Sequence, residues 1–352
     1  MAQAVHLPLL QKRPDLFRVT ALCDLSRAAR DAGGERYGVP PERRLGSLDE
    51  LLAAGGLDAL MVLTSGSHAS AAAAAARAGL PVFCEKPLAY TVAETDQLAS
   101  VPLALGYMKL YDPAVRRARE LLAERPPPRS VEVTVLHPPP GPQLAHVRLP
   151  PPAADVPAET LARLRDETAA LVAQALGPAP PGLVRLYTDV LLGSVVHDLA
   201  VVRELAADPV RIDYAETWGD TSVVVLATLP REGRLSIRWH YLERYPAYRE
   251  EICVHDERGT VALVFPSPYL LHAPTVLTVV EGENGSARTT RFRSAVEAFE
   301  DELAAFHRLV TAGEPTAAGV AEGRADIVTC QRIARRLAQQ RGLELNGEAA
   351  RA

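Results

Sequence analysis

Short apolar runs alternate with helical stretches through the first third of the chain, and no other feature of the sequence limits the possible folds as strongly. The run Phe17–Cys23 is typical of a strand and is followed by a helical stretch over 26–37. A helix over 48–54 then leads to the almost wholly apolar run 57–63, which suits a strand buried on both faces. Strands and helices in this order predict right-handed crossovers and a parallel sheet.

A third unit completes the pattern and indicates where ligands should bind. A helix over 70–78 precedes the strand Pro81–Cys84. In an open parallel sheet, ligands bind at the carboxyl ends of the strands. Polar residues follow the predicted strands at these ends, namely Asp24, Thr64 with Ser65, and Glu85 with Lys86.

The segment before the first predicted strand is unusual for such a sheet. Ala2–Gln11 is typical of a helix, but neither a strand nor a Gly-x-Gly turn stands ahead of it. The first strand of this kind of sheet is central, so its neighbours would lose backbone partners without it. We therefore hypothesise that Met1 is an internal methionine and that the gene product carries roughly ten or more further residues, which form the strand and the turn.

Composition and charge narrow the class of protein. A chain of 352 residues with 48% hydrophobic residues can bury a large core, and this length usually divides into two domains. The formal net charge of -5 offers no basic surface, so we expect neither nucleic acid nor a membrane as a partner. The N-terminus lacks a secretory signal, which favours a cytoplasmic protein. The four cysteines are far apart, so we expect no metal site.

Four motifs occur in the order and spacing of one known family. Glu85-Lys86-Pro87 directly follows an apolar strand, Gly106–Pro113 begins with a Gly-Tyr pair, and Ser194–Asp198 contains a histidine. A fourth segment, 299–326, has the aromatic and acidic residues of two closing helices. With these motifs the chain resembles the Gfo/Idh/MocA family, which includes glucose-fructose oxidoreductase, inositol dehydrogenases and biosynthetic sugar reductases.

The resemblance implies an NAD(P)-dependent oxidoreductase and gives roles to individual residues. Lys86 takes the place of the group that accepts the hydroxyl proton as the hydride leaves, and burial beside a positive nicotinamide would lower its pKa. His197 takes the place of the residue that meets the substrate hydroxyl, although a lone histidine on an apolar helix is more often a core residue. Tyr107 and Lys109 would lie near the nicotinamide end and bind the substrate, but either could equally be a surface residue.

Residues at the strand ends are the candidates for cofactor binding. Asp24 stands about 20 residues after the expected glycine turn, where a carboxylate binds the adenosine ribose and favours NAD. Asp24 and Ser26 could instead cap the next helix, and Arg27 keeps NADP open because a guanidinium can pair with a 2'-phosphate. The other candidates follow the next two strands, where plain turns are the alternative: Thr64, Ser65, His68, Glu85, Lys86 and Pro87.

Two departures from the family pattern affect the mechanism. The family's Gly-x-Gly-x-x-Gly/Ala turn would end at Ala2, so both leading glycines are absent. In inositol dehydrogenases an Asp stands four residues before the active-site His, but here that residue is Gly193. A carboxylate that assists His197 must therefore come from elsewhere. Asp189 and Asp198 are near in sequence, and neither can be assigned from the sequence alone.

The predicted fold class is α/β, a Rossmann-type parallel sheet without its first strand and glycine turn, followed by an α+β domain. We place the dinucleotide-binding domain at 1–124, a substrate and oligomerisation domain at 125–320, and a C-terminal helix that braces the first domain at 321–352. A proline-rich region over 137–157 precedes an amphipathic helix in the second domain. Six strand-like runs predict an open, mostly antiparallel sheet, and they cover 213–217, 222–229, 235–241, 249–255, 260–265 and 275–280.

These observations predict hydride transfer between NAD(P), with NAD preferred, and a hydroxyl or keto group of a sugar-like or cyclitol-like metabolite. By resemblance the protein would be a homodimer or homotetramer. The alternative is a paralogue that kept the fold, lost cofactor turnover and serves as a ligand-binding or scaffolding protein. The missing glycine turn and Gly193 motivate this alternative.

Overall fold

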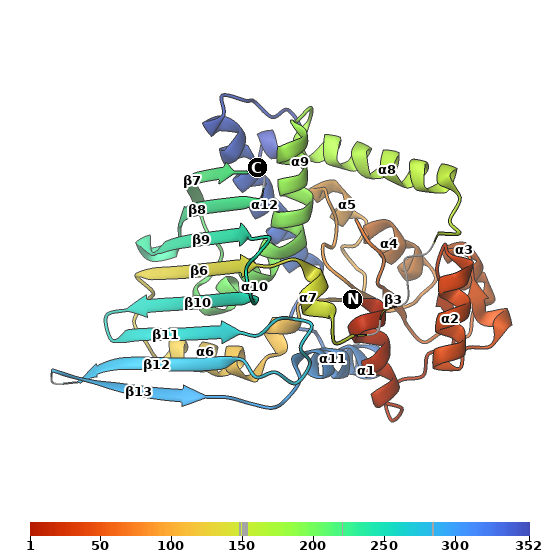
Figure 1. The fold of residues 1–352 in the computed structure, drawn as a ribbon, viewed down its shortest axis with the longest axis horizontal. Helices are drawn as coiled ribbons and strands as arrows, with labels where there is room; N and C mark the ends of the chain where they lie inside the picture. Colours follow the sequence, from red (N-terminus) through yellow and green to blue (C-terminus); the bar gives the residue numbers. More distant parts are fainter. Residues whose placement is uncertain (148, 150–153, 220, 284) are drawn as a thin grey trace.

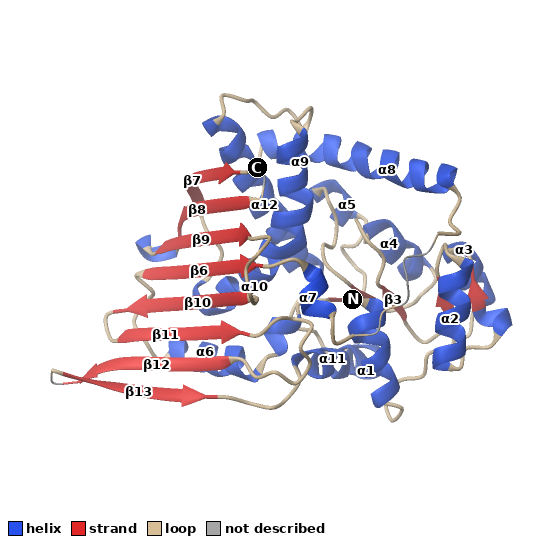
Figure 2. Ribbon diagram, in the orientation of Figure 1, coloured by secondary structure: helices blue, strands red, loops and turns tan. Residues whose placement is uncertain are grey.

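The computed structural model has a small parallel sheet region and a large, mostly antiparallel sheet, with helices between them (Figure 1). It describes residues 1–147, 149, 154–219, 221–283 and 285–352, so positions 148 and 150–153 of the predicted proline-rich region lie outside this description. The large sheet forms one side of the molecule and the N-terminal elements form the other. Figure 2 shows the strands of the large sheet side by side in one layer.

Strands and helices alternate through the N-terminal part, as the apolar runs predict. Hydroxyl groups of Ser26, Ser47 and Thr91 accept backbone N–H groups three residues ahead, which fixes where three of these helices begin. The elements in chain order are a π-helical turn Ala2–His6, α1 Leu7–Lys12, β1 Leu22–Cys23, α2 Arg27–Tyr37, β2 Arg44–Leu45, α3 Leu48–Ala54, β3 Leu60–Val62, α4 Ala69–Arg77, β4 Val82–Cys84, α5 Val92–Asp96 and β5 Leu103–Leu105.

The parallel sheet is divided between β1 and β3. β1 pairs with β2, while β3, β4 and β5 form a separate three-stranded sheet, and all these pairs are parallel. The predicted strand Phe17–Cys23 was expected to be longer, but only Leu22 and Cys23 have ladder partners within the described part of the chain. In a dinucleotide-binding sheet of order 3-2-1-4-5-6, the first strand lies at the position of this division.

The second sheet has eight strands in the order β13-β12-β11-β10-β6-β9-β8-β7. β6 and β9 are parallel and the other neighbours are antiparallel, so the predicted open, mostly antiparallel sheet is confirmed. β13 was not predicted, because all seven of its side chains are exposed and its sequence shows no apolar alternation. The bounds are β6 Ser130–His137, β7 Arg211–Trp218, β8 Ser222–Thr228, β9 Arg234–Tyr241, β10 Arg249–Asp256, β11 Gly259–Phe265, β12 Val276–Glu283 and β13 Ser286–Phe292.

Helices join the large sheet to the N-terminal part (Figure 1). α12 packs against β7 of the large sheet and also against α5 and β5. Gly323 of α12 permits this approach, because a Cβ atom there would lie 2.8 Å from Cδ2 of Leu88. The bounds are α6 Pro113–Ala123, α7 Pro140–Leu144, α8 Ala158–Leu176, α9 Pro181–Arg185, a π-helix Leu186–Val195, α10 Val196–Ala206, α11 Ala298–Ala312 and α12 Val320–Gln340.

The predicted amphipathic helix and the two closing helices are present as α8, α11 and α12, and a short helix, α7, lies within the region predicted to be irregular. The domain boundaries at 124 and 320 stay predictions. Among the described residues, no helix is both long enough and apolar enough to cross a membrane.

Candidate active site

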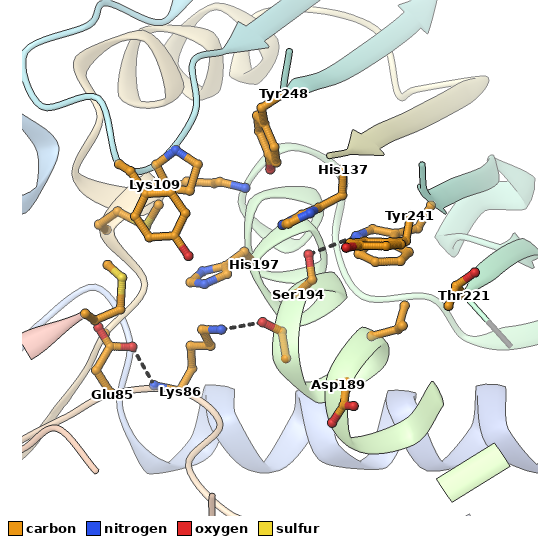
Figure 3. Close-up of a pocket in the computed structure, with 18 of the residues that line it drawn as sticks. Glu85, Lys86, Lys109, His137, Asp189, Ser194, His197, Thr221, Tyr241 and Tyr248 are labelled. Atoms are coloured by element: carbon orange, nitrogen blue, oxygen red, sulfur yellow. Dashed lines mark hydrogen bonds between the residues drawn. The ribbon is translucent and has the colours of Figure 1, made fainter. Parts of the chain in front are cut away.

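A cavity of about 400 Å³ lies between the end of β4 and the ends of the central strands of the large sheet. Figure 3 shows Lys86, Lys109 and His197 converging on it from three different segments. Aromatic and imidazole side chains from β6, β9 and the segment before β10 form the opposite wall. The titratable and aromatic residues of the lining are Glu85, Lys86, Lys109, His137, Arg185, Asp189, His197, Trp239, Tyr241, Tyr248, Tyr269 and Phe299.

Lys86 follows β4 directly and its side chain crosses toward the π-helix that precedes α10. Its ammonium donates a hydrogen bond to the carbonyl oxygen of Gly193. Burial lowers the pKa of Lys86, and the positive charge of Lys109 lowers it further, while the Glu85 carboxylate opposes both effects. The neutral amine is therefore more accessible than in an ordinary lysine, and a neutral amine can accept a proton.

Glu85 is held by a residue that the sequence did not single out. His6 lies in the first helical turn, is completely buried, and places Nε2 2.7 Å from Oε1 of Glu85. Its ring stands edge-on to Phe83 and Phe299. Burial opposes ionisation of Glu85, but the His6 contact and Lys86 together hold its pKa below the usual value. Glu85 is thus a carboxylate fixed beside Lys86 by His6.

His197 is the second residue of α10 and faces the cavity (Figure 3). Burial lowers its pKa well below the usual value, and the charges of Lys86 and Lys109 lower it further. Nδ1 has no hydrogen-bond partner among the described residues. Tyr107 packs edge-on against this ring at 5.8 Å between centroids. The site therefore holds a neutral imidazole, which can exchange a proton with a bound hydroxyl.

Lys109 faces the cavity, whereas Tyr107 lies behind the cavity wall. The Tyr107 hydroxyl donates to Oδ2 of Asp326 at 2.6 Å on α12, and Tyr107 does not line the cavity. Lys109 does line it, and its ammonium forms a buried ion pair with Glu250. Tyr248 donates to the second oxygen of Glu250 at 2.5 Å. One buried carboxylate, Glu250 of β10, thus holds both Lys109 and Tyr248 at the cavity.

The two carboxylates near His197 in sequence have different surroundings. Asp198 is buried, and both burial and the Glu250 carboxylate raise its pKa well above the usual value. Burial and the neighbouring Glu250 carboxylate thus favour the protonated form of Asp198. Asp189 lines the cavity and accepts a hydrogen bond from the Thr188 hydroxyl at 2.8 Å. Of the two, Asp189 is the carboxylate that a ligand in this cavity can reach.

A second, larger cavity of about 1930 Å³ occupies the division between β1 and β3. Asp24 and Thr64 line it. Asp24 also accepts the backbone N–H of Ser26 at 2.8 Å, but Ser26 and not Asp24 is the N-cap of α2. Met1 lines the small cavity, whereas Ala2 and Gln3 line the large one. The two cavities therefore border the same N-terminal segment.

The other predicted cofactor residues do not line the large cavity. Ser26 caps α2 and Arg27 is exposed, with Nε 3.5 Å from Asp31. Ser65 is exposed. His68 is buried, with its ring nitrogens 2.6 and 2.8 Å from the carbonyl oxygens of Pro87 and Thr64. His68 therefore ties the loop after β3 to the loop after β4.

Glu250 and His6, which the sequence did not single out, both follow the periodicity of neighbouring buried residues. Glu250 is in phase with the buried Ile252 and Val254 of β10, so a period of two places it on the apolar face. His6 precedes Leu9 and Leu10 by three and four residues, which places it on the apolar face of its helix. Aromatic residues of the cavity wall, such as Trp239, carry no comparable signal because they occur in strands of every kind.

Comparison with known proteins supports an oxidoreductase. A family model described as an oxidoreductase family with an NAD-binding Rossmann fold matches residues 1–102. The chain is 23% identical over 331 residues to a myo-inositol 2-dehydrogenase of Thermotoga maritima, a match that covers 88% of this chain and 86% of the relative. It is 38% identical over 107 residues to an inositol 2-dehydrogenase of Leifsonia xyli subsp. xyli, which covers 28% of this chain and only 30% of the relative.

Solved structures share the fold across almost the whole chain. An aldose-aldose oxidoreductase from Caulobacter crescentus, complexed with glycerol, superposes with a TM-score of 0.71 at 17% identity and covers 96% of this chain and 95% of its own. A 3-ketoreductase from Actinomadura kijaniata, in complex with NADP, gives a TM-score of 0.66 at 19% identity and covers 93% and 91%. At these identities the likeness establishes the fold.

Proposed function

The chain belongs to the Gfo/Idh/MocA family of oxidoreductases, dehydrogenases that act on CH–OH groups, and we propose that it transfers a hydride between NAD(P) and a hydroxyl or keto group of a sugar-like or cyclitol-like metabolite. The observation that carries the proposal is the pairing of Lys86 and His197 in one cavity, each with a pKa below its usual value. Two bases whose burial favours their neutral forms suit removal of a hydroxyl proton.

The large groove fits a dinucleotide at both of its ends. The carboxylate of Asp24 faces it at the end of β1, where an adenosine ribose would offer hydroxyl groups. At the other end the groove borders the same N-terminal segment as the cavity of Lys86. Asp24 and Thr64 would hold the adenosine side, and Lys86 would contact the nicotinamide. Bound there, the nicotinamide supplies the acceptor or donor of the hydride.

Lys86 accepts the hydroxyl proton in the oxidation direction. Its hydrogen bond to the Gly193 carbonyl aims the amine across the cavity floor, and Glu85, fixed by His6, holds the loop beneath it. As the carbon loses its hydride, the developing carbonyl needs its proton removed, and neutral Lys86 takes it at Nζ. In the reduction direction the same ammonium returns that proton to the oxygen.

His197 and Asp189 orient the substrate. The neutral imidazole of His197 accepts a hydrogen bond from the reacting or the adjacent hydroxyl. Asp189, elsewhere in the cavity lining, accepts one from another hydroxyl of the substrate. Lys109, anchored on Glu250, donates to a further oxygen, and the Tyr248 hydroxyl, which gives its own proton to Glu250, accepts from a further hydroxyl. A cavity of about 400 Å³ with aromatic walls and several polar groups has the size and chemistry for a single polyhydroxylated ring.

The decisive experiment is a fluorescence titration of the purified protein with NADH and with NADPH, followed by turnover assays with inositols and aldoses. We expect saturable binding and cofactor-dependent turnover of at least one polyol. Absence of binding at millimolar cofactor would favour the ligand-binding or scaffolding alternative and end this proposal.

We also infer that the protein is a homo-oligomer that associates through the large sheet. Large apolar side chains are exposed on the face of this sheet that points away from the core: Trp218 of β7, Leu226 of β8 and Val264 of β11. Exposed apolar groups gathered on one sheet indicate a protein interface. Light scattering should give a dimeric or tetrameric mass, and Leu226→Glu should reduce it; a monomer at micromolar concentration contradicts the inference.

A further inference from the structure

The N-terminus of α2 holds a carboxylate from a distant part of the chain. Asp155, which precedes α8, accepts the Ser26 hydroxyl at 2.5 Å through Oδ1 and the backbone N–H of Ala28 at 3.0 Å through Oδ2. The Ser26 hydroxyl and the Ala28 N–H lower the pKa of Asp155, so the group is an anion. Helix N-termini stabilise anions because their free N–H groups and the helix dipole both favour negative charge.

This anion position borders the proposed cofactor groove. Asp24 lies two residues before Ser26 at the end of β1, and both Asp24 and Asp155 line the groove. Leu149 and Ala154 line it as well, so these three described residues belong to the groove wall. Asp155 comes from beyond β6 and lies 127 residues after Ala28 in the chain.

The two arginines next to this position already have partners, although Arg30 also lines the groove. Arg30 donates to the carbonyl oxygen of Asp24 at 2.9 Å, and Arg27 extends toward Asp31 with 82% of its side chain exposed. Two carboxylates, Asp24 and Asp155, therefore face the position beside the helix N-terminus, while the Ala28 N–H that an anionic ligand would use is already bound.

NAD and NADP differ at the corresponding point of the ligand. NAD has a ribose 2'-hydroxyl, which can donate a hydrogen bond to a carboxylate such as Asp24. NADP has a 2'-phosphate with about two negative charges, which needs free N–H groups and cations. Asp155 already accepts the hydrogen bond of the Ala28 N–H, and its negative charge would repel the 2'-phosphate. Such a repulsive element is an effective way to reject one of two similar ligands.

We propose that Asp155 is a specificity-determining residue that admits NAD(H) to the groove and excludes NADP(H) by holding the α2 N-terminus in place of a 2'-phosphate. The inference rests on the proposed function, since it requires the groove to bind a dinucleotide. It assigns to Asp155 a role beyond capping α2, because this carboxylate adds a negative charge to the groove wall.

The test compares NADH and NADPH affinity by fluorescence titration in the wild-type protein and in Asp155→Ala, Asp155→Asn and the control Asp166→Ala. Asp166 is an exposed acidic residue of α8, outside the groove lining, and controls for net charge. We expect Asp155→Ala to tighten NADPH binding at least about tenfold, with NADH changed less than about threefold, and Asp155→Asn to have an intermediate effect. The gain should shrink at high salt, because it is electrostatic.

Three outcomes would overturn the inference. An unchanged NADPH affinity in Asp155→Ala means that the carboxylate does not exclude the phosphate. An equal change for both cofactors, together with a lower melting temperature, means that Asp155 is only a helix cap. A wild-type protein that binds NADPH as tightly as NADH refutes the selectivity while the proposed function stands, whereas failure of every variant to bind either cofactor refutes both.

Discussion

Replacement of Glu250 by glutamine tests how the charge of Lys109 is balanced beside the cavity. Glu250 is completely buried and accepts hydrogen bonds from Lys109 and Tyr248. Removing one partner of a buried ion pair usually costs about 3–5 kcal/mol. A smaller loss is expected here because Asp198 belongs to the same cluster, and its pKa is raised by burial and by the Glu250 carboxylate.

Glutamine removes the negative charge that helps keep Asp198 protonated, so Asp198 can ionise and become the counterion of Lys109. We therefore expect Glu250→Gln to lower the free energy of unfolding by about 1–3 kcal/mol, the cost of an imperfectly satisfied buried polar group. Asp198→Asn alone should cost about 1 kcal/mol, because the amide can still donate to Glu250. The double variant leaves Lys109 without either carboxylate and should lose more than the sum of the two single variants, by about 1 kcal/mol or more.

Urea unfolding of the four proteins at pH 7 measures this coupling, with Glu251→Gln as the matched control. Glu251 is the next residue of β10 and pairs with Arg249 at the surface, so its replacement should stay within about 0.5 kcal/mol of wild type. If Glu250→Gln alone shows the full loss, or if the losses simply add, Asp198 does not take over the charge and the reasoning is wrong.

The remaining predictions concern catalysis and the N-terminal segment. Lys86→Ala should fold normally and lose about 100-fold or more in turnover, and unchanged turnover would remove Lys86 from the mechanism. Oxidation by the wild type should rise with pH through an ionisation below the usual lysine pKa, because burial lowers the pKa of Lys86 and only its neutral form accepts a proton; a pH-independent rate contradicts this. His197→Ala should lower activity with little change in NADH affinity, whereas loss of folding would favour a core role. A strand followed by a Gly-x-Gly turn, fused ahead of Met1, should raise both melting temperature and NADH affinity if it pairs with β1 and β3; equal values show that it does not fill the groove between them.

The sequence predicted the parts of the fold that depend on local periodicity. Apolar runs and their polar ends identified β3 and β4 and brought Glu85 and Lys86 to the edge of a sheet. The extent of β1 was overestimated because propensity describes what a segment can do, whereas a ladder also needs a partner strand. Contacts between distant segments escaped prediction for a related reason: Asp155 reaches Ser26 across 129 residues, and nothing local in a proline-rich segment specifies that contact.

The division of the parallel sheet links the sequence argument to the cofactor question. β1 and β3 each present a row of backbone groups toward the same apolar groove, which is lined by Leu22 and Leu60 from the two strands and by Phe306 from α11. In a sheet of this type a central strand would satisfy those groups, and the turn after it would offer N–H groups to a pyrophosphate. The groove therefore has the position that both the central strand and the phosphate-binding turn take in such a sheet. An added strand should stabilise the fold even without cofactor, whereas a bound dinucleotide should protect mainly the residues at the strand ends, and hydrogen exchange at Leu22 and Leu60 distinguishes these effects.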